Sequence, residues 1–176
     1  MPAHRLGMSP TDAPADLLPE RILPGPGLAA AGMSVPSYST LYRRGQLPPE
    51  FFSHVERSRR LLSREGFLAL AAYRAVVERR VEIGELPPAA FLRWASLWLR
   101  GVPVRELWVR YYGRAGDPDS RVSVLPNDDL LPEPAAAGAL LSIRLDLEAI
   151  FGSAVRAYSS LAADRRDIWS ELADGE

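Results

Sequence analysis

The sequence predicts a mainly α-helical fold with a short β segment near its C-terminal end. Apolar residues recur at spacings of three, four and seven over residues 49–84 and again over 88–112, which is the period of an amphipathic helix. Apolar and polar residues alternate strictly over 141–147, which is typical of a strand. The 176 residues are 47% hydrophobic and 24% charged, a composition that indicates a globular chain.

Turn residues divide the chain into three expected regions. Residues 1–48 form an N-terminal arm and a helix-turn-helix-like segment that ends at Pro48-Pro49. Residues 49–116 form a central helical domain whose apolar faces favour oligomerisation. Residues 117–176 contain an acidic linker, the β segment and a final helix.

Composition excludes several classes of function. The chain has no cysteine, which rules out disulfides, thiolate metal sites and cysteine nucleophiles, and it has only two histidines, His4 and His54. No HxxEH or GxSxG motif occurs, and the acids around Asp117 and Asp128 lie in a Pro/Gly-rich stretch. We therefore expect no catalysis, no cofactor and no metal site.

The sequence also predicts a cytoplasmic protein that does not enter a membrane. No uninterrupted apolar run approaches the ~18 residues that a membrane span needs. The N-terminal residues lack the charged-then-apolar order of a signal peptide.

Charge is unevenly distributed along the chain. Residues 37–80 carry nine arginines and four acids, a net charge of +5, whereas residues 117–176 carry five arginines and twelve acids, a net charge of −7. All 21 basic residues are arginine. Arginine suits planar, bidentate contacts to phosphate or guanine, and a GC-rich genome accounts for its use equally well.

The N-terminal region contains two short predicted helical pieces. Pro24-Gly25-Pro26-Gly27 is expected to break the chain before an Ala-rich helical turn over 28–33. A second helix is expected over Tyr38–Arg44, capped by Ser37 or Ser39 and ended by Gly45. A short, capped helix that ends in arginines suits a DNA groove, and the same two turns suit an ordinary connector.

From Pro49 the pattern predicts one helix of about 35 residues, with Gly66 as the point at which it could bend or split. Unbroken, it would be ~50 Å long at 1.5 Å per residue, too long to bury its apolar stripe without a partner. Its basic face is either a solvated surface or a phosphate-contacting one. The arginines of that face are Arg57, Arg59, Arg60 and Arg64.

A second helix is expected from Pro88 to Arg100, followed by more helix over Val104–Tyr112. Its aromatic side chains could stack on single-stranded bases, but at helical spacing they favour a core or a subunit interface. Residues 97–107 also have the rhythm of a second helix-turn-helix. The residues expected at the subunit interface are Phe67, Leu70, Tyr73, Val77, Trp94, Trp98 and Trp108.

The C-terminal region is expected to contain two strands and a helix. Arg121–Leu125 alternates as a short strand, and residues 140–147 form the second strand or, alternatively, the beginning of a continuous helix over 139–172. From Glu148 the apolar spacing predicts a final helix with a charged exposed face.

The run GMSVPSYSTLYRRGQLPPEFFSHVERSRR resembles the DNA-binding segment of bacteriophage terminase small subunits. The matching positions are Pro36, Ser39–Arg43 and Pro49–Phe51, followed by Arg57 and Arg59. The resemblance implies a non-catalytic protein that recognises viral DNA. It would assemble a homo-oligomeric ring through a central antiparallel helical hairpin and hand DNA to the large ATPase–nuclease subunit.

The resemblance also implies which residues contact double-stranded DNA. Those expected to lie nearest the DNA are Ser39, Thr40, Arg43 and Arg44, with Tyr42 packing the short helix and the arginines of the following helix on phosphates or on a ring surface. Two alternatives remain open: a dimeric helix-turn-helix transcription regulator, and a structural oligomeriser or adaptor whose basic face contacts acidic protein.

Overall fold

The computed structural model describes residues 17–56, 59–79, 86–113, 121–126, 139 and 141–173. Side chains are described throughout these ranges except at residues 54–56, 59 and 164–173. In chain order the elements are α1 (Pro24–Ala30), α2 (Val35–Arg43), η2 (Pro49–Phe51), β1 (Phe52–Glu56), β2 (Arg59–Leu62), α3 (Arg64–Val77), η3 (Pro88–Phe91), α4 (Leu92–Leu99), β3 (Glu106–Tyr112), β4 (Arg121–Pro126), β5 (Leu141–Asp146) and α6 (Leu147–Ala173).

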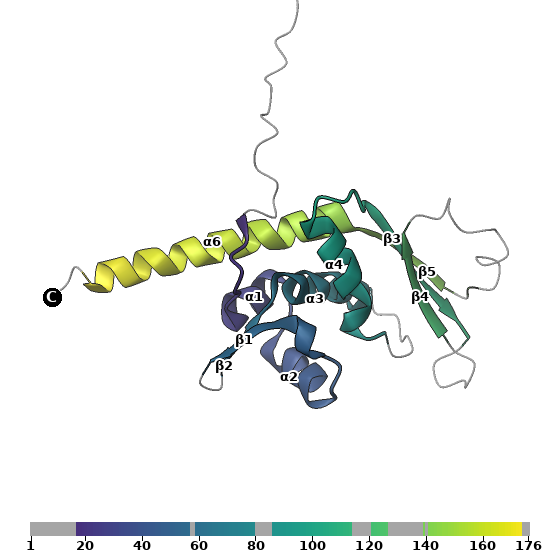
Figure 1. The fold of residues 1–176 in the computed structure, drawn as a ribbon, viewed down its shortest axis with the longest axis horizontal. Coiled ribbons are helices and arrows are strands. Elements are labelled where there is room, and N and C mark those ends of the chain that lie inside the picture. The colour runs from purple at the N-terminus through teal and green to yellow at the C-terminus, as the bar shows by residue number, and fades with distance from the viewer. Residues whose placement is uncertain are drawn as a thin grey trace, which may run out of the picture.

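The fold is mixed α/β, so the prediction of a mainly α-helical chain is wrong. The described strands form two antiparallel sheets, a β1–β2 hairpin and a three-stranded sheet of order β4-β3-β5. Figure 1 shows the larger sheet at one end of the molecule, α2 and the hairpin on the lower side, and α6 running along the upper side and continuing past the body.

The long helix predicted from Pro49 is replaced by a 3-10 turn, a hairpin and a shorter helix. Phe52 pairs with Leu62, and the backbone of Ile22 bonds to Leu62 on the other side of β2, with N···O distances of 3.0 and 2.9 Å. Ser63 then caps α3, because its Oγ accepts from the Gly66 amide at 2.9 Å and donates to the Glu50 carbonyl at 2.7 Å. The helical spacing of apolar residues therefore arises from two elements that meet at Ser63.

In the second half of the predicted helical hairpin, the helix expected over Pro88–Arg100 is confirmed as η3 and α4, whereas the further helix expected over Val104–Tyr112 is strand β3. Within β3, Leu107, Val109 and Tyr111 are buried on one face, while Trp108 and Tyr112 alternate with them. The aromatic residues Trp108 and Tyr112 place apolar side chains on the other face of the strand as well, which obscures the period of two. Of the central helical hairpin expected for a ring, only the shorter helices α3 and η3–α4 are present, and they pack against one another.

The predictions of two C-terminal strands and a final helix are confirmed, whereas the predicted acidic linker lies outside the described residues. Arg121–Pro126 and Leu141–Asp146 are strands that both pair with β3, and Leu147 begins the final helix. The alternative of continuous helix over 139–172 is wrong, because β5 precedes α6.

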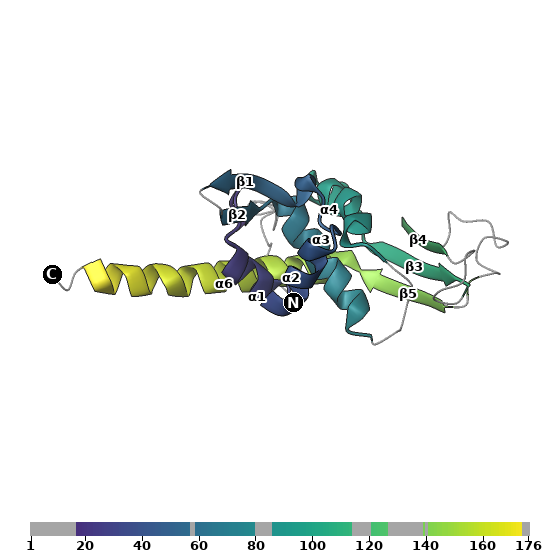
Figure 2. The same ribbon diagram turned by 90° about the horizontal axis from the view of Figure 1, so that it is seen from below.

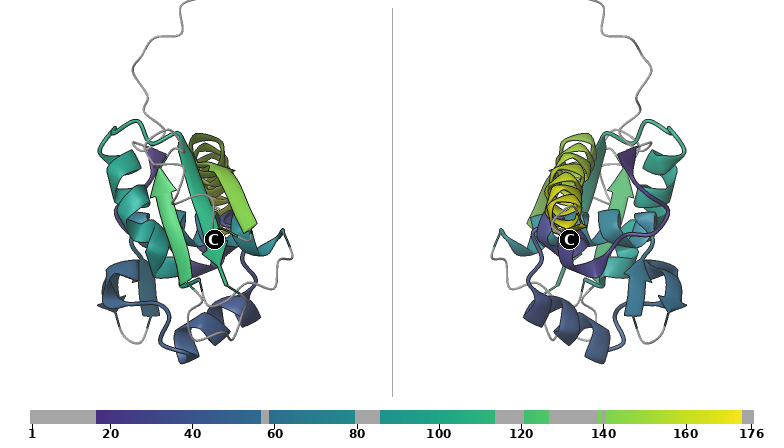
Figure 3. Two further views of the ribbon diagram at one scale, coloured as in Figure 1. Left: turned by 90° about the vertical axis from the view of Figure 1, so that its right-hand side faces the viewer. Right: turned by 90° about the vertical axis from the view of Figure 1, so that its left-hand side faces the viewer.

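One buried apolar cluster joins the N-terminal helices, α3, α4, the larger sheet and the first half of α6. Helix α3 lies at its centre, with every residue from Gly66 to Ala72 buried. Figures 2 and 3 show α1, α3 and α6 stacked side by side, with α2 on the outside. The predicted boundary at 48/49 lies at a turn, and the predicted boundary at 116/117 lies outside the described residues. The buried core includes residues on both sides of each boundary.

Candidate nucleic-acid interface

Helices α1 and α2 are joined by a four-residue turn that fixes the angle between them. Gly32 takes a φ of +68°, which suits glycine, and Met33 is buried beneath the turn. The Arg74 Nε of α3 donates to the Gly32 carbonyl at 2.9 Å, and its Nη2 lies 3.1 Å from Glu78 Oε1. A short glycine-containing turn between two helices is the arrangement of a helix-turn-helix unit.

Helix α1 begins inside the segment for which the sequence predicts a chain break. Pro24 and Pro26 occupy its first turn, where a missing amide hydrogen costs nothing. Gly27 lies against Ile22, since a Cβ at this position would be 2.7 Å from Ile22 Cγ2. The PGPG sequence therefore starts a helix that packs closely on the N-terminal segment.

Helix α2 begins three residues earlier than predicted and ends at Arg43, one residue before the predicted end. Ser34, rather than Ser37 or Ser39, is its N-cap, and Ser34 Oγ accepts from the Ser37 amide at 3.3 Å. Gly45, with a φ of +67°, follows its C-terminus. Leu41 is buried against the core, which leaves the opposite face of α2 outward.

The outward face of α2 carries the residues expected nearest to DNA. Arg43 and Arg44 are exposed, and Ser39 and Thr40 are half-buried. Arg43 Nε donates to the Ser39 carbonyl at 3.3 Å, and Thr40 Oγ1 donates to the Pro36 carbonyl at 3.0 Å. The hydrogen bond from Arg43 to Ser39 uses only Nε, the inner nitrogen of the guanidinium. Bidentate contacts to phosphate or guanine use the outer part of the guanidinium.

Arg60 of β2 connects the hairpin to α2. Its guanidinium carbon lies 4.3 Å from the Tyr42 ring centroid and 5.7 Å from that of Phe52, and the two rings pack edge to face at 6.3 Å. Burial raises the pKa of the Tyr38 hydroxyl, and the positive charge of Arg60 opposes that rise. The exposed Arg60 is therefore held beside α2 by ring contacts.

Arg44 extends the same basic surface toward α3. Burial raises the pKa of the Tyr73 hydroxyl, and the charge of Arg44 opposes that rise. Arg43 and Arg44 follow one another at the end of α2, and Arg60 of the hairpin contacts Tyr42 of α2. Figure 1 shows α2 and the hairpin on the same, lower side of the molecule.

The remaining predicted DNA-contacting arginines are placed differently. Arg64 lies in the first turn of α3 and its Nε donates to the Pro19 carbonyl at 3.2 Å, so it ties α3 to the N-terminal segment. Arg57 lies outside the described residues, and Arg59 is placed in β2 by its backbone alone.

The residues expected at an oligomer interface are divided between the core and the surface. Phe67 and Leu70 are fully buried inside the protomer, and Trp94 is 7% exposed. Tyr73, Trp98 and Trp108 are half-buried, and Val77 is 42% exposed. Three of the seven residues are therefore buried inside the protomer, and the other four are partly exposed.

The sequence does not identify two residues of this site. The spacing of apolar residues after Pro49 places Phe52 in a helical stripe, although Phe52 lies in β1 and packs against Tyr42. No pattern marks Arg74, although it holds the turn between α1 and α2. Both contacts depend on long-range packing, so no short motif identifies them.

Other kinds of site find no support in the described part of the chain. No group of three or more histidine, cysteine, aspartate or glutamate side chains there is arranged to hold a metal ion. None of the described helices combines the length and the apolar character needed to cross a bilayer. In comparisons with known proteins, the sequence matches no protein-family model and no curated protein.

Proposed function

We propose that this protein binds double-stranded DNA, with α2 as the helix that enters the major groove. The observation that carries the proposal is the α1–turn–α2 corner, which presents a capped helix whose last residues are exposed arginines. In a helix-turn-helix protein the second helix lies in the major groove while the first crosses the backbone.

The chemistry of α2 suits both positioning on DNA and base reading. Arginine pairs bidentately with guanine O6 and N7, and it also neutralises phosphate. Arg43 and Arg44 supply these groups at the end of α2, and the Ser39 hydroxyl lies one turn earlier. Arg60, held against Tyr42, adds a third positive charge from the hairpin.

Two DNA-binding roles are possible, transcription regulation and DNA packaging. Of these we propose regulation, by a protein that binds DNA as a small oligomer. The resemblance to terminase small subunits falls on α2 and η2, and the DNA-binding proposal uses α2 directly. The packaging role implied by the resemblance also needs an oligomerising helical hairpin over 49–84 and 88–112, and in those spans β1, β2 and β3 replace part of each helix, leaving the shorter α3 and η3–α4. A large closed ring in native mass measurements would favour packaging, whereas a dimer near twice the 19.4 kDa chain mass would favour regulation.

The test is the salt dependence of DNA binding by an Arg43→Ala/Arg44→Ala variant. We would measure fluorescence anisotropy with a mixed-sequence duplex of about 30 bp, raising the salt concentration from about 50 to 200 mM. Each phosphate contact that the substitutions remove reduces the slope of log K against log salt by about 0.9. We therefore expect weaker binding and a slope flatter by one to two such steps.

Arg100→Ala is the matched control. Arg100 is also exposed at a helix C-terminus, and its Nε donates to the Ser96 carbonyl at 3.3 Å, as Arg43 does to Ser39. The end of α4 lies on the opposite side of the molecule from α2 (Figure 1). An unchanged affinity and slope in the double variant, or an equal loss in Arg100→Ala, would contradict the assignment of α2.

A further inference from the structure

Helix α6 is only partly covered by the body of the protein. Its first half buries Leu147, Phe151, Val155 and Tyr158, and Ala162 is the last residue described as packed on the core. The helix continues to Ala173, and Figures 1 and 2 show this second half extending alone beyond the other elements. A lone amphipathic helix of this kind gains stability by pairing with another element.

A second apolar stripe runs beside the core-facing stripe in the first half of α6, and the sequence pattern places further apolar residues on the same face of its second half. It comprises Ile150, Ala154, Ala157 and Leu161, which follow one another at spacings of four, three and four, and the sequence continues the stripe with Ile168 and Leu172. Leu161, at its middle, is 36% exposed. Beyond Leu161 the charged run Asp164–Asp167 interrupts the sequence pattern, with Arg165 falling in the stripe, before the apolar residues resume at Ile168.

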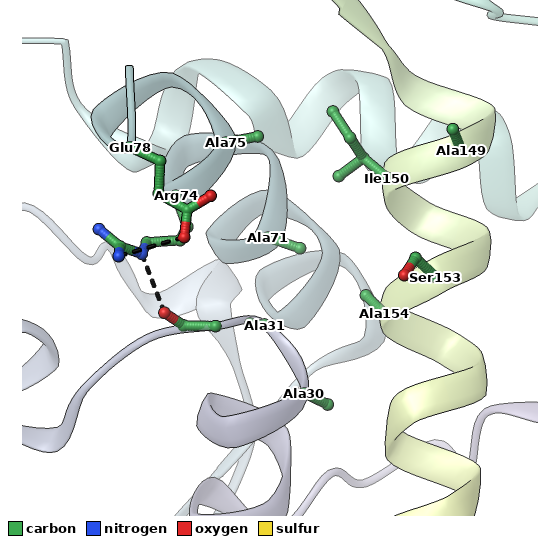
Figure 4. A pocket seen from close by; sticks show the side chains of 11 residues that line it. Ala30, Ala31, Ala71, Arg74, Ala75, Glu78, Ala149, Ile150, Ser153 and Ala154 are labelled. Atoms are coloured by element: carbon green, nitrogen blue, oxygen red, sulfur yellow. Dashed lines mark hydrogen bonds and ion pairs between the residues drawn. The ribbon is translucent and has the colours of Figure 1, made fainter. Parts of the chain in front are cut away.

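In the first half of α6 this stripe lines a groove of about 370 Å³ between α1, α3 and α6. Figure 4 shows Ile150 and Ala154 on the α6 side and Ala71 and Ala75 on the α3 side, with Ala30 below. Small side chains line most of the groove, so a helix carrying larger apolar residues can approach closely.

The stripe is self-complementary when two copies of α6 run antiparallel with Leu161 on the two-fold axis. Ile150 then aligns with the partner position of Leu172, Ala154 with that of Ile168, and Ala157 with that of Arg165. The small residues of the groove thus meet the large residues of the projecting half. The helix carries four acids and three arginines over 147–173, so two copies repel one another little.

We propose that the occupant of this groove is the projecting half of α6 from a second copy of the chain, in an isologous, antiparallel dimer centred on Leu161. Such a contact is closed by two-fold symmetry, since each copy supplies the same groove and the same projecting helix. The overlap from residue 150 to 172 spans about 33 Å of helix at 1.5 Å per residue. This proposal stands independently of DNA binding.

The first test is the solution mass of the full chain by light scattering. The wild type is expected at twice 19.4 kDa, and Leu161→Arg at 19.4 kDa. Ala163→Arg is the matched control, because Ala163 is exposed on the opposite face of the same helix and its variant should remain dimeric. A monomeric wild type, a larger ring, or an unchanged dimer in Leu161→Arg would overturn the proposal.

The second test determines helix direction and uses the lack of cysteine in the chain. A single cysteine at the axis, Leu161→Cys, should cross-link two copies with a short bis-maleimide, whereas Leu172→Cys should not, since the two copies of residue 172 would lie about 33 Å apart. Cross-linking of both variants would indicate a parallel pair, and cross-linking of neither would remove the interface. Either of these two outcomes would contradict the antiparallel dimer, whether or not the protein binds DNA.

Discussion

The Tyr111 hydroxyl is a polar group placed inside the apolar core. Tyr111 is 5% exposed, and its hydroxyl has no hydrogen-bond partner among the described residues. Burial, and to a smaller extent the neighbouring Tyr73 hydroxyl, raises the pKa of Tyr111 to about 12. The tyrosine ring at this position therefore stabilises the sheet by packing while its hydroxyl contributes little.

We predict that Tyr111 makes the protein less stable at alkaline pH. The unfolded chain loses this proton near pH 10 and the folded chain near 12, so the stabilisation is complete below pH 10 and is lost as the pH rises through that window. The loss should reach up to about 2 kcal/mol by pH 12. The chain has no lysine or cysteine, so only tyrosines titrate extensively there.

Urea unfolding of the wild type and Tyr111→Phe at pH 8, 10 and 11 measures this effect. The phenylalanine variant should be as stable as the wild type or slightly more stable at pH 8, because it removes an unsatisfied hydroxyl. Its free energy of unfolding should fall less steeply above pH 10. Parallel pH profiles for the two proteins would contradict the role assigned to Tyr111.

At the scale of elements, Gly66 marks the junction that the helical pattern conceals. A Cβ at Gly66 would lie 2.5 Å from the carbonyl oxygen of Phe51, so the first turn of α3 touches the backbone that leads into β1. We predict that Gly66→Ala destabilises the fold by about 1–3 kcal/mol, as overpacking against fixed backbone does.

Gly152 provides the comparison within another helix. A Cβ there would meet only the terminal atoms of Arg156, 3.3 Å away, which can move aside. Gly152→Ala should therefore be neutral or stabilise by up to about 1 kcal/mol through helix propensity. Urea unfolding of the two variants measures both values, and equal effects would show that the contact with Phe51 does not determine the role of Gly66.

The elements that can be predicted from sequence are those whose apolar period is uninterrupted. β5 and α6 follow their periods of two and 3.6, and α2 carries its own stop signal at Gly45. Residues 49–62 and 104–112 cannot be assigned in this way, because neighbouring elements or alternating aromatic residues imitate a helical spacing. The basic residues of α2 are identifiable from sequence, whereas the contacts of Tyr42 with Phe52 and Arg60, and the nearness of Arg44 to Tyr73, depend on tertiary packing.

At the scale of the whole molecule, the two proposals together restrict the DNA site. A two-fold dimer related through α6 carries its two α2 helices as symmetric equivalents, so a bound duplex must present the same half-site twice in opposite orientation. For helix-turn-helix dimers the half-sites lie about 10–10.5 bp apart, or at multiples of that spacing. We therefore predict that selection from a random duplex pool recovers inverted repeats.

The variant that separates the copies tests the connection between dimer and DNA site. Leu161→Arg should bind one half-site with a salt slope about half that of the wild type, because a single copy makes half of the phosphate contacts, while Ala163→Arg should keep the full slope. Arg43→Ala/Arg44→Ala should remain dimeric and bind DNA more weakly. Selected sequences without an inverted repeat, or a full slope in monomeric Leu161→Arg, would show that each chain binds DNA alone and that α6 pairing serves another purpose.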